Sequence, residues 1–197
     1  MYSRIMKHYH LIITLSVLLS ACSNGGISKE SSRPPAGNPD GVILVQEFSD
    51  LQCPACRVAH ANVSTPLLQQ YGNVIRFEWK HFPLQSHRYA MDAAKASECA
   101  ADQGKFWVYI DKIFEHQSEL SPDSLIAWAG ELKLDMELFE RCSKSNAKKG
   151  IALSDYKEGR DMGVGGTPTF FVDGKQVPTN QLGVIIEQRI EQLKQRL

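Results

Sequence analysis

The chain has 197 residues, of which 43% are apolar, and its 22 basic side chains balance 22 acidic ones. This length and apolar content suffice for one domain with a proper core. The neutral balance, the scattered aromatic residues and the lack of a basic cluster argue against nucleic-acid binding.

The first 21 residues have the make-up of an export signal. Arg4 and Lys7 precede an apolar run, residues 11–19, which is too short to span a bilayer as a stable helix. The run ends in Leu-Ser-Ala-Cys22 and resembles the bacterial lipoprotein box, which implies that residues 1–21 are cleaved and Cys22 is lipidated. An ordinary cleaved signal or an uncleaved anchor is the alternative. An export signal predicts an oxidising compartment outside the cytoplasm, where disulfides persist.

Residues 22–40 are rich in Gly, Ser, Pro and Asn and have no apolar periodicity. Such a composition predicts a flexible tether between the lipidated Cys22 and the folded domain. The domain is therefore predicted to comprise residues 41–197, as a monomer.

A redox motif follows the first predicted strand. Residues 42–48 are almost continuously apolar, as in a strand covered on both faces, and lead into Cys53-Pro-Ala-Cys56. A cysteine in the first turn of a helix lies beside unpaired N–H groups and the positive end of the helix dipole, which favour its thiolate. The pair predicts a dithiol that exchanges two electrons, with no metal and no other cofactor. A zinc site is the alternative, but the remaining cysteines are scattered singly and no histidine pair follows.

Glu47 interrupts the apolar strand, and a buried carboxyl group there is expected to have a raised pKa unless it is paired. Residues 74–82 alternate in polarity and predict a second strand, parallel to the first. Lys80 on this strand is a candidate partner of Glu47 beneath the dithiol. The alternative is a solvated lysine at the edge of the sheet.

The helix between these strands, residues 57–71, is predicted to kink near Pro66. Its three- and four-residue spacing predicts a buried face made of Val58, Ala61, Thr65 and Leu68.

Residues 87–162 change to a helical pattern and are predicted to form a helical bundle inserted between the strands of one sheet. Cys99 and Cys142 lie on two of these helices. In an exported protein they predict a structural disulfide, which stabilises the fold by up to roughly 4 kcal/mol. Two buried free thiols are the alternative.

The last part of the chain begins with a Gly-rich segment that leads into Thr167 and Pro168, which suits a tight loop with a cis proline. Asp173-Gly174 predicts a hairpin turn between two short strands. A closing helix is expected over residues 180–197.

The chain resembles the thioredoxin superfamily in its order of elements and in two motifs. The order is strand, helix and strand, then a helical insertion, then a final hairpin and helix. The motifs are Cys53-Pro-Ala-Cys56 and Thr167-Pro168. More narrowly, the chain is similar to the bacterial DsbA-like thiol:disulfide oxidoreductases. The resemblance implies that Cys53 is the nucleophile and Cys56 the resolving cysteine, and that Thr167 and Pro168 bind the substrate backbone. It further implies that Glu47 moves protons for Cys56 and that Lys80 pairs with Glu47.

One position departs from the pattern of the strongest oxidants in this family, which have a histidine between the cysteines. Here that position is Ala55, so a weaker oxidant is expected. Arg57 and His60 follow on the helix and are interpreted as surface residues, although either is a candidate to support the thiolate.

Three functions are compatible with this sequence. The first is an envelope oxidase that introduces disulfides into exported proteins and is reoxidised by a quinone-coupled membrane partner. The second is a reductase or isomerase, kept reduced by a membrane thiol reductant. The third is a lipid-tethered binding module without enzymatic activity. All three place the protein on the periplasmic side of a membrane, held by its lipid anchor.

Overall fold

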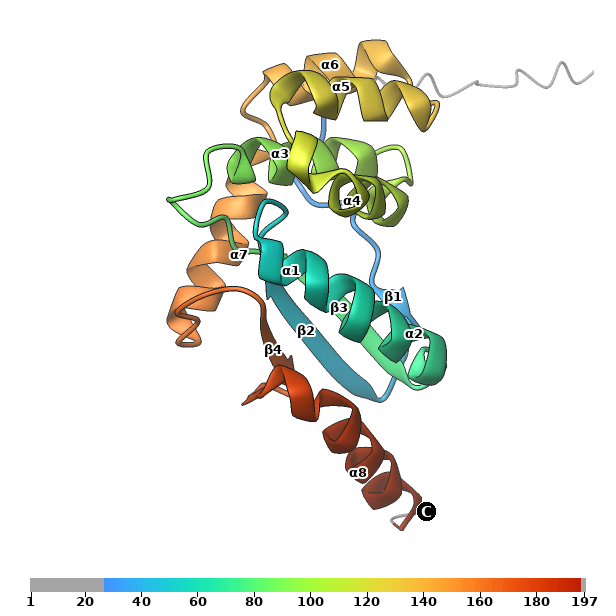
Figure 1. Ribbon diagram of the computed structural model, residues 1–197. Helices are drawn as coiled ribbons and strands as arrows, with labels where there is room; N and C mark the ends of the chain where they lie inside the picture. The colour runs from blue at the N-terminus through green and yellow to red at the C-terminus, as the bar shows by residue number, and fades with distance from the viewer. Residues whose placement is uncertain (1–26, 196–197) are drawn as a thin grey trace, which may run out of the picture.

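A five-stranded sheet in the order β1-β3-β2-β4-β5 runs through the middle of the computed structural model, which describes residues 27–195 (Figure 1). Strands β2 and β3 are parallel, and the remaining neighbours are antiparallel. The predicted signal sequence, residues 1–21, and Cys22 lie outside the described residues. In chain order the elements are β1 Ala36–Gly37, β2 Ile43–Ser49, α1 Pro54–Ala59, the π-helical turn His60–Ser64, α2 Thr65–Tyr71, β3 Ile75–His81, α3 Ala90–Ala101, α4 Phe106–Glu115, α5 Pro122–Glu131, α6 Met136–Lys144, α7 Lys149–Asp161, β4 Thr169–Val172, β5 Lys175–Val177 and α8 Leu182–Lys194.

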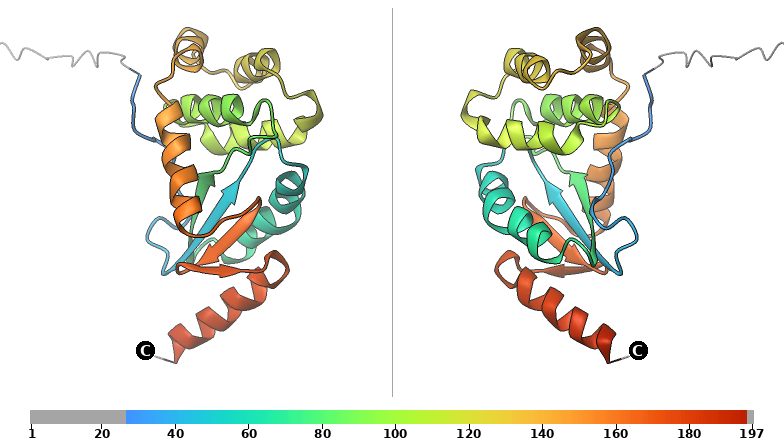
Figure 2. Two further views of the ribbon diagram at one scale, coloured as in Figure 1. Left: turned by 90° about the vertical axis from the view of Figure 1, so that its left-hand side faces the viewer. Right: turned by 90° about the vertical axis from the view of Figure 1, so that its right-hand side faces the viewer.

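Helices cover both faces of the sheet. Figure 2 shows α1 and α2 on one face and α7 on the other, while α3 to α6 lie beyond the end of the sheet where β2 meets α1. Helix α7 approaches closely because Gly159 has no side chain: a Cβ there would lie 2.8 Å from the rings of Phe48 and Phe82. The predicted α/β fold with its helical insertion is confirmed.

The first helix is divided by the π-helical turn. The amide of Thr65 donates to the carbonyl of His60, so the chain gains a residue in the turn that precedes Pro66. The predicted break near Pro66 is therefore present. The predicted buried face is wrong at Val58 and Ala61, which are exposed, whereas Thr65 and Leu68 are half-buried. The residues that face inward are Cys56, Ala59, Ser64 and Leu67.

The predicted flexible tether is wrong for its described part, which is docked on the domain. Strand β1 pairs with β3, and the guanidinium of Arg33 forms ion pairs with Glu98 and Asp155. Burial alone would raise the pKa of Glu98, but His81 and Arg33 lower it to about 2. We call residues 28–37 the strap. Its polar composition resembles that of a flexible linker. The residues that the strap contacts lie far away in the sequence, so its own sequence does not show that it is docked.

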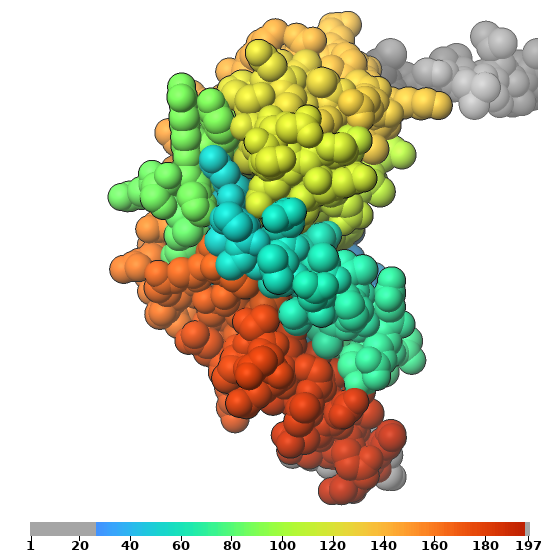
Figure 3. Space-filling model, in the orientation of Figure 1, coloured from blue at the N-terminus to red at the C-terminus, as the bar shows by residue number. Residues whose placement is uncertain are grey.

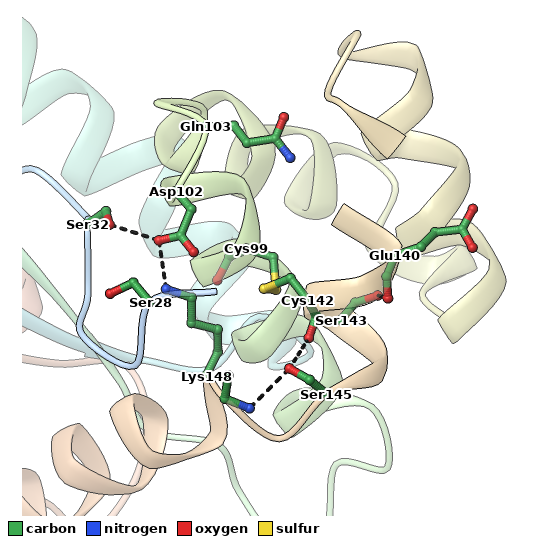
Figure 4. Close-up of a disulfide and its surroundings, with 12 residues drawn as sticks. Ser28, Ser32, Cys99, Asp102, Gln103, Glu140, Cys142, Ser143, Ser145 and Lys148 are labelled. Atoms are coloured by element: carbon green, nitrogen blue, oxygen red, sulfur yellow. Dashed lines mark hydrogen bonds and ion pairs between the residues drawn. A yellow bond between two sulfur atoms is a disulfide. The ribbon is translucent and has the colours of Figure 1, made fainter. Parts of the chain in front are cut away.

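A disulfide joins Cys99 of α3 to Cys142 of α6, and the strap crosses beside it (Figure 4). Lys148 is fully buried nearby, with its Nζ 2.7 Å from Asp102 and 3.1 Å from the carbonyl of Glu30. Ser32 of the strap donates to the same Asp102 carboxylate at 2.8 Å. The disulfide and this buried lysine therefore hold α3, α6 and the strap together.

Candidate active site

Cys53 occupies the N-cap position of α1, directly after the loop that leaves β2. Pro54 fits the first helical position because no hydrogen bond is needed from its nitrogen. The sulfur is only slightly exposed, although Pro54 and Ala55 beside it are exposed. In Figure 3 this segment, in cyan, reaches the surface beneath the helical insertion.

The surroundings of Cys53 stabilise its thiolate. The pKa of Cys53 is lowered to about 5, first by the hydrogen bond from the Cys56 thiol. Burial acts in the opposite direction, while the Thr167 side chain and the amides of Cys56 and Ala55 add to the lowering. Negative charge on this sulfur is thus favoured by the start of α1, as expected for an activated cysteine.

Cys56 is fully buried, and both cysteines are free thiols in this structure. Burial raises the pKa of Cys56, and the adjacent Cys53 thiolate raises it further. One thiol is therefore ionised at neutral pH and the other holds its proton. This asymmetry assigns attack and leaving-group chemistry to Cys53.

Thr167 and Pro168 are joined by a cis peptide bond and face the cysteine pair. The Sγ of Cys53 lies 3.5 Å from the carbonyl oxygen of Thr167. The loop brings backbone polar groups beside the reactive sulfur, where an extended peptide is able to pair with them.

Glu47 lies on β2 and is fully buried. Burial raises its pKa, which the side chains of Ser64 and Ser49 and the charge of His60 partly oppose. Ser49 likewise favours the ionised form of Cys56, so it lies between the carboxyl group and the buried thiol.

The predicted pair between Glu47 and Lys80 does not form. Glu47 is opposite Trp79 in the parallel ladder, so Lys80 is one residue further on and points to the other face. There its Nζ lies 3.0 Å from Glu158 of α7. Lys80 is therefore not in the active site, and it is not a solvated lysine at the edge of the sheet either, because its side chain is only 16% exposed and β3 lies between β1 and β2.

Asp50 is a site residue that the sequence did not reveal. Its carboxylate is buried and accepts hydrogen bonds from the amides of Gln52 and Leu84, both at 2.7 Å. Its own amide donates to the Sγ of Cys56 at 3.4 Å, and its carbonyl accepts from the amide of Cys53. Asp50 thus contacts both cysteines through its backbone. The available signal was an acidic residue between a buried strand and the first cysteine.

Two glutamines join the same loop to the helical insertion. Gln117 donates to the carbonyls of Leu51 and Cys53 at 2.9 and 3.1 Å, and Gln52 accepts from the amide of Tyr89 at 2.6 Å. The helical insertion therefore forms one side of the active site.

Neither a metal site nor a membrane span is found in the described part of the chain. Within residues 27–195, no group of three or more His, Cys, Asp or Glu side chains is placed to hold a metal ion. Over the same residues, no helix combines the length and apolar character needed to cross a membrane.

Curated relatives of the chain are longer proteins. It is 39% identical over 142 residues to a protein of Salinispora arenicola named Na(+)/H(+) antiporter NhaA 1, which covers 71% of this chain and 21% of that protein. A Herminiimonas arsenicoxydans protein named Na(+)/H(+) antiporter NhaA is 36% identical over 142 residues. The chain spans about a fifth of the length of these relatives.

Solved structures match the chain over most of its length. A thioredoxin-like oxidoreductase from Silicibacter pomeroyi has a TM-score of 0.70 and 25% identity, over 82% of this chain and 94% of that chain. BdbD from Bacillus subtilis in its oxidised form has a TM-score of 0.72 and 22% identity, over 81% and 94%. DsbA2 from Pseudomonas aeruginosa has a TM-score of 0.59 and 26% identity, over 73% and 82%.

The family profile described as Thioredoxin matches residues 29–192, which include all but the first residue of the strap, the cysteine pair and the cis-proline loop. With this match the chain belongs to the thioredoxin family, and its fold is that of the oxidoreductase structures named above.

Proposed function

We propose that this protein introduces disulfides into exported proteins in the cell envelope. The observation that carries the proposal is the contrast between the two thiols, because the pKa of Cys53 is lowered to about 5 while burial raises that of Cys56. A low-pKa sulfur is a good leaving group, so a disulfide that contains Cys53 is readily transferred to another thiol.

The reaction begins with the Cys53–Cys56 disulfide. A substrate thiolate attacks the Sγ of Cys53, the bond to Cys56 breaks, and Cys56 leaves as a thiolate that must take up a proton. Glu47, kept protonated by burial, is the proposed donor of that proton. A second substrate thiolate then attacks the first substrate sulfur. Cys53 leaves as a thiolate, so the substrate has lost two electrons and the enzyme has gained them.

The backbone of Thr167 and Pro168 is proposed to hold the substrate as an added strand during both attacks. A quinone-coupled membrane partner is proposed to accept the two electrons and restore the disulfide. The export signal and Cys22 support a lipid-anchored protein on the periplasmic side. That similar sequence occurs within longer proteins named as antiporters also supports a place at a membrane.

A reductase or isomerase is the second candidate, and Ala55 is the observation that favours it. Alanine offers no side-chain charge or donor to the thiolate, so fewer groups stabilise the reduced form. We expect a reduction potential between about −120 mV, the value of a strong DsbA oxidant, and about −270 mV, that of thioredoxin.

Equilibration of the purified protein with glutathione buffers tests the direction, together with alkylation trapping of Cys53 in intact cells. An oxidase is mostly oxidised in cells, whereas a Cys53 found mostly reduced would support the reductase. Cys53→Ala should abolish thiol exchange, with Cys99→Ser/Cys142→Ser as the matched control that keeps it. Full activity of Cys53→Ala would instead indicate a binding module.

A further inference from the structure

Glu47 lacks the lysine partner expected for it, and its surroundings contain a different one. Its Oε2 accepts a hydrogen bond from the hydroxyl of Ser64 at 2.6 Å. Its Oε1 is buried and forms no hydrogen bond of ordinary length and angle within the described residues, and neither does the hydroxyl of Ser49, although Ser49 lies close enough to oppose the rise in the pKa of Glu47. Unpaired buried oxygens cost stability, and their presence beside a reactive centre points to a role in chemistry.

The π-helical turn places His60 on the same side of the helix as Ser64, which contacts this carboxyl group. Ser64, which contacts Glu47, is the last residue of the turn and His60 is the first, and residues four apart lie on one helical face. The His60 side chain is only 15% exposed. Its charge is also the one whose field acts on Glu47, where it opposes the effect of burial on the pKa.

Helix α4 fixes the imidazole from the other side. Nε2 of His60 lies 2.7 Å from Oδ1 of Asp111, whose side chain is 59% exposed. The ring of Phe114, one turn further along α4, packs against the imidazole with 4.8 Å between ring centroids. His60 is therefore fixed by Asp111 and Phe114 of α4, on the side of the helix from which Ser64 contacts Glu47.

We infer that His60, held by Asp111, is the positioning residue that controls the protonation of Glu47 and connects it to solvent. It takes the place expected for Lys80, which lies on the other face of the sheet. The inference rests on the proposed role of Glu47 as the proton donor to Cys56.

Solvent reaches His60 through a groove of about 330 Å³ between α2, α4 and β1. Among the residues that line it, His60 and Asp111 titrate, and the others do not: Ala36, Thr65, Leu68, Gln69 and Trp107. The titratable groups that face His60 are thus Asp111 from α4 and Glu47 from β2.

The proton steps balance without any further reactant. Glu47 gives its proton to the Cys56 thiolate and becomes a carboxylate. His60 then returns a proton to Glu47 and takes up another in its place from solvent in the groove. Bonds between heavy atoms do not change in these steps.

The test is the pKa of Glu47 in the reduced protein, followed by the infrared carboxyl band and assigned with Glu47→Gln. In His60→Gln the loss of the positive charge should raise the pKa of Glu47 by about half a unit to one unit. Asp111→Asn removes a negative charge as well as the hydrogen bond to the imidazole, and these effects oppose each other, so it should shift the pKa of Glu47 less than His60→Gln does. Lys112→Gln is the matched control, since it removes the neighbouring charge on α4, which pairs with Glu131 instead.

A second measurement is the rate at which a small thiol reduces the enzyme disulfide. His60→Gln should slow it by about threefold to tenfold above pH 7, where Glu47 must be reprotonated. The pKa of Cys53 should stay unchanged in all three variants, which separates this role from a general disturbance of the site. His60→Asn serves as a second variant if His60→Gln unfolds.

An unchanged pKa of Glu47 in a folded His60 variant would overturn the inference, and so would an equal shift in Lys112→Gln. If Cys53→Ala lacks activity in either case, the proposed function stands and only the role of His60 fails. If Cys53→Ala keeps activity, the proposed function fails whatever the titration of Glu47.

Discussion

The Nδ1 of His87 lies 2.8 Å from the carboxylate of Asp50, at the edge of the cysteine pair. Asp50 is buried on the loop before Cys53, whereas His87 comes from the segment that leads into the helical insertion. The pair therefore ties the redox loop to the insertion, and the backbone of Asp50 contacts both cysteines.

Asp50→Ala should destabilise the protein by about 2 to 4 kcal/mol, because it leaves the amides of Gln52 and Leu84 without partners. His87→Gln retains a donor for the carboxylate and should cost less than about 1 kcal/mol. Urea unfolding of the reduced proteins measures both. Equal midpoints for Asp50→Ala and the wild type would show that the carboxylate does not hold the loop.

The thiol titration of Cys53 should show a pKa of about 5 when followed by thiolate absorbance in the ultraviolet. Cys56→Ala should raise this pKa, since it removes the bond from Cys56, which is the largest cause of the shift. Cys99→Ser/Cys142→Ser should leave it unchanged. A Cys53 that titrates near pH 8.5, as a free cysteine does, would contradict the assignment of the nucleophile.

The same shift predicts how the stability of the reduced protein depends on pH. The pKa of Cys53 is lower in the folded state than in the unfolded chain, so ionisation stabilises the fold. This contribution is complete above about pH 8.5, falls as the pH drops, and is lost below about 5. As the pH drops over that range, the stability of the reduced protein should fall relative to that of the oxidised protein, because only the reduced form carries the thiolate. Thermal unfolding of both forms from pH 4 to 9 measures it.

The titration of Glu47 changes the stability of the protein with pH in the opposite direction to that of Cys53. Burial raises its pKa, so the folded state holds a proton that the unfolded chain releases above about pH 4.3, and stability falls as the pH rises. Glu47→Gln should therefore stabilise the protein at pH 8 and have little effect at pH 4. A difference in melting temperature that is the same at both pH values would indicate that the carboxyl group does not titrate abnormally.

Removal of the disulfide with Cys99→Ser/Cys142→Ser should cost roughly 2 to 4 kcal/mol, because it releases α6 from α3. The reduction potential of the Cys53 pair should not change. Guanidinium unfolding and glutathione equilibration measure the two quantities. A shift of the potential as large as the change in stability would mean that the two disulfides are coupled.

The parts of the fold that depend on local pattern were predictable. The redox motif, the succession of helices from α3 to α7 and the closing hairpin all follow from periodicity and from Gly and Pro positions. The parts that depend on pairing across the chain were not. Strand β1 lies in a sequence that reads as a linker, and only its contact with β3 makes it a strand.

The same limit applies to the site. Lys80 and Glu47 lie on adjacent parallel strands. The register between the strands decides whether the two side chains lie on the same face of the sheet, and neither strand's sequence alone predicts that register. Asp50 acts through bonds to backbone amides, which have no signature in side-chain types. His60 is the first residue of the π-helical turn, and no residue pattern in the sequence predicts the extra residue of that turn.

Because the strap is docked on the domain, few residues separate the domain from Cys22. Ile27, its first neighbour, lies in a hollow beside Cys99 and Cys142, at the far side of the helical insertion from α8. Five peptide links separate Ile27 from Cys22, a span of at most about 18 Å. If Cys22 carries the lipid, the helical insertion lies close to the bilayer. Clients would then have to come to the membrane surface, since the enzyme has little freedom to reach out to them.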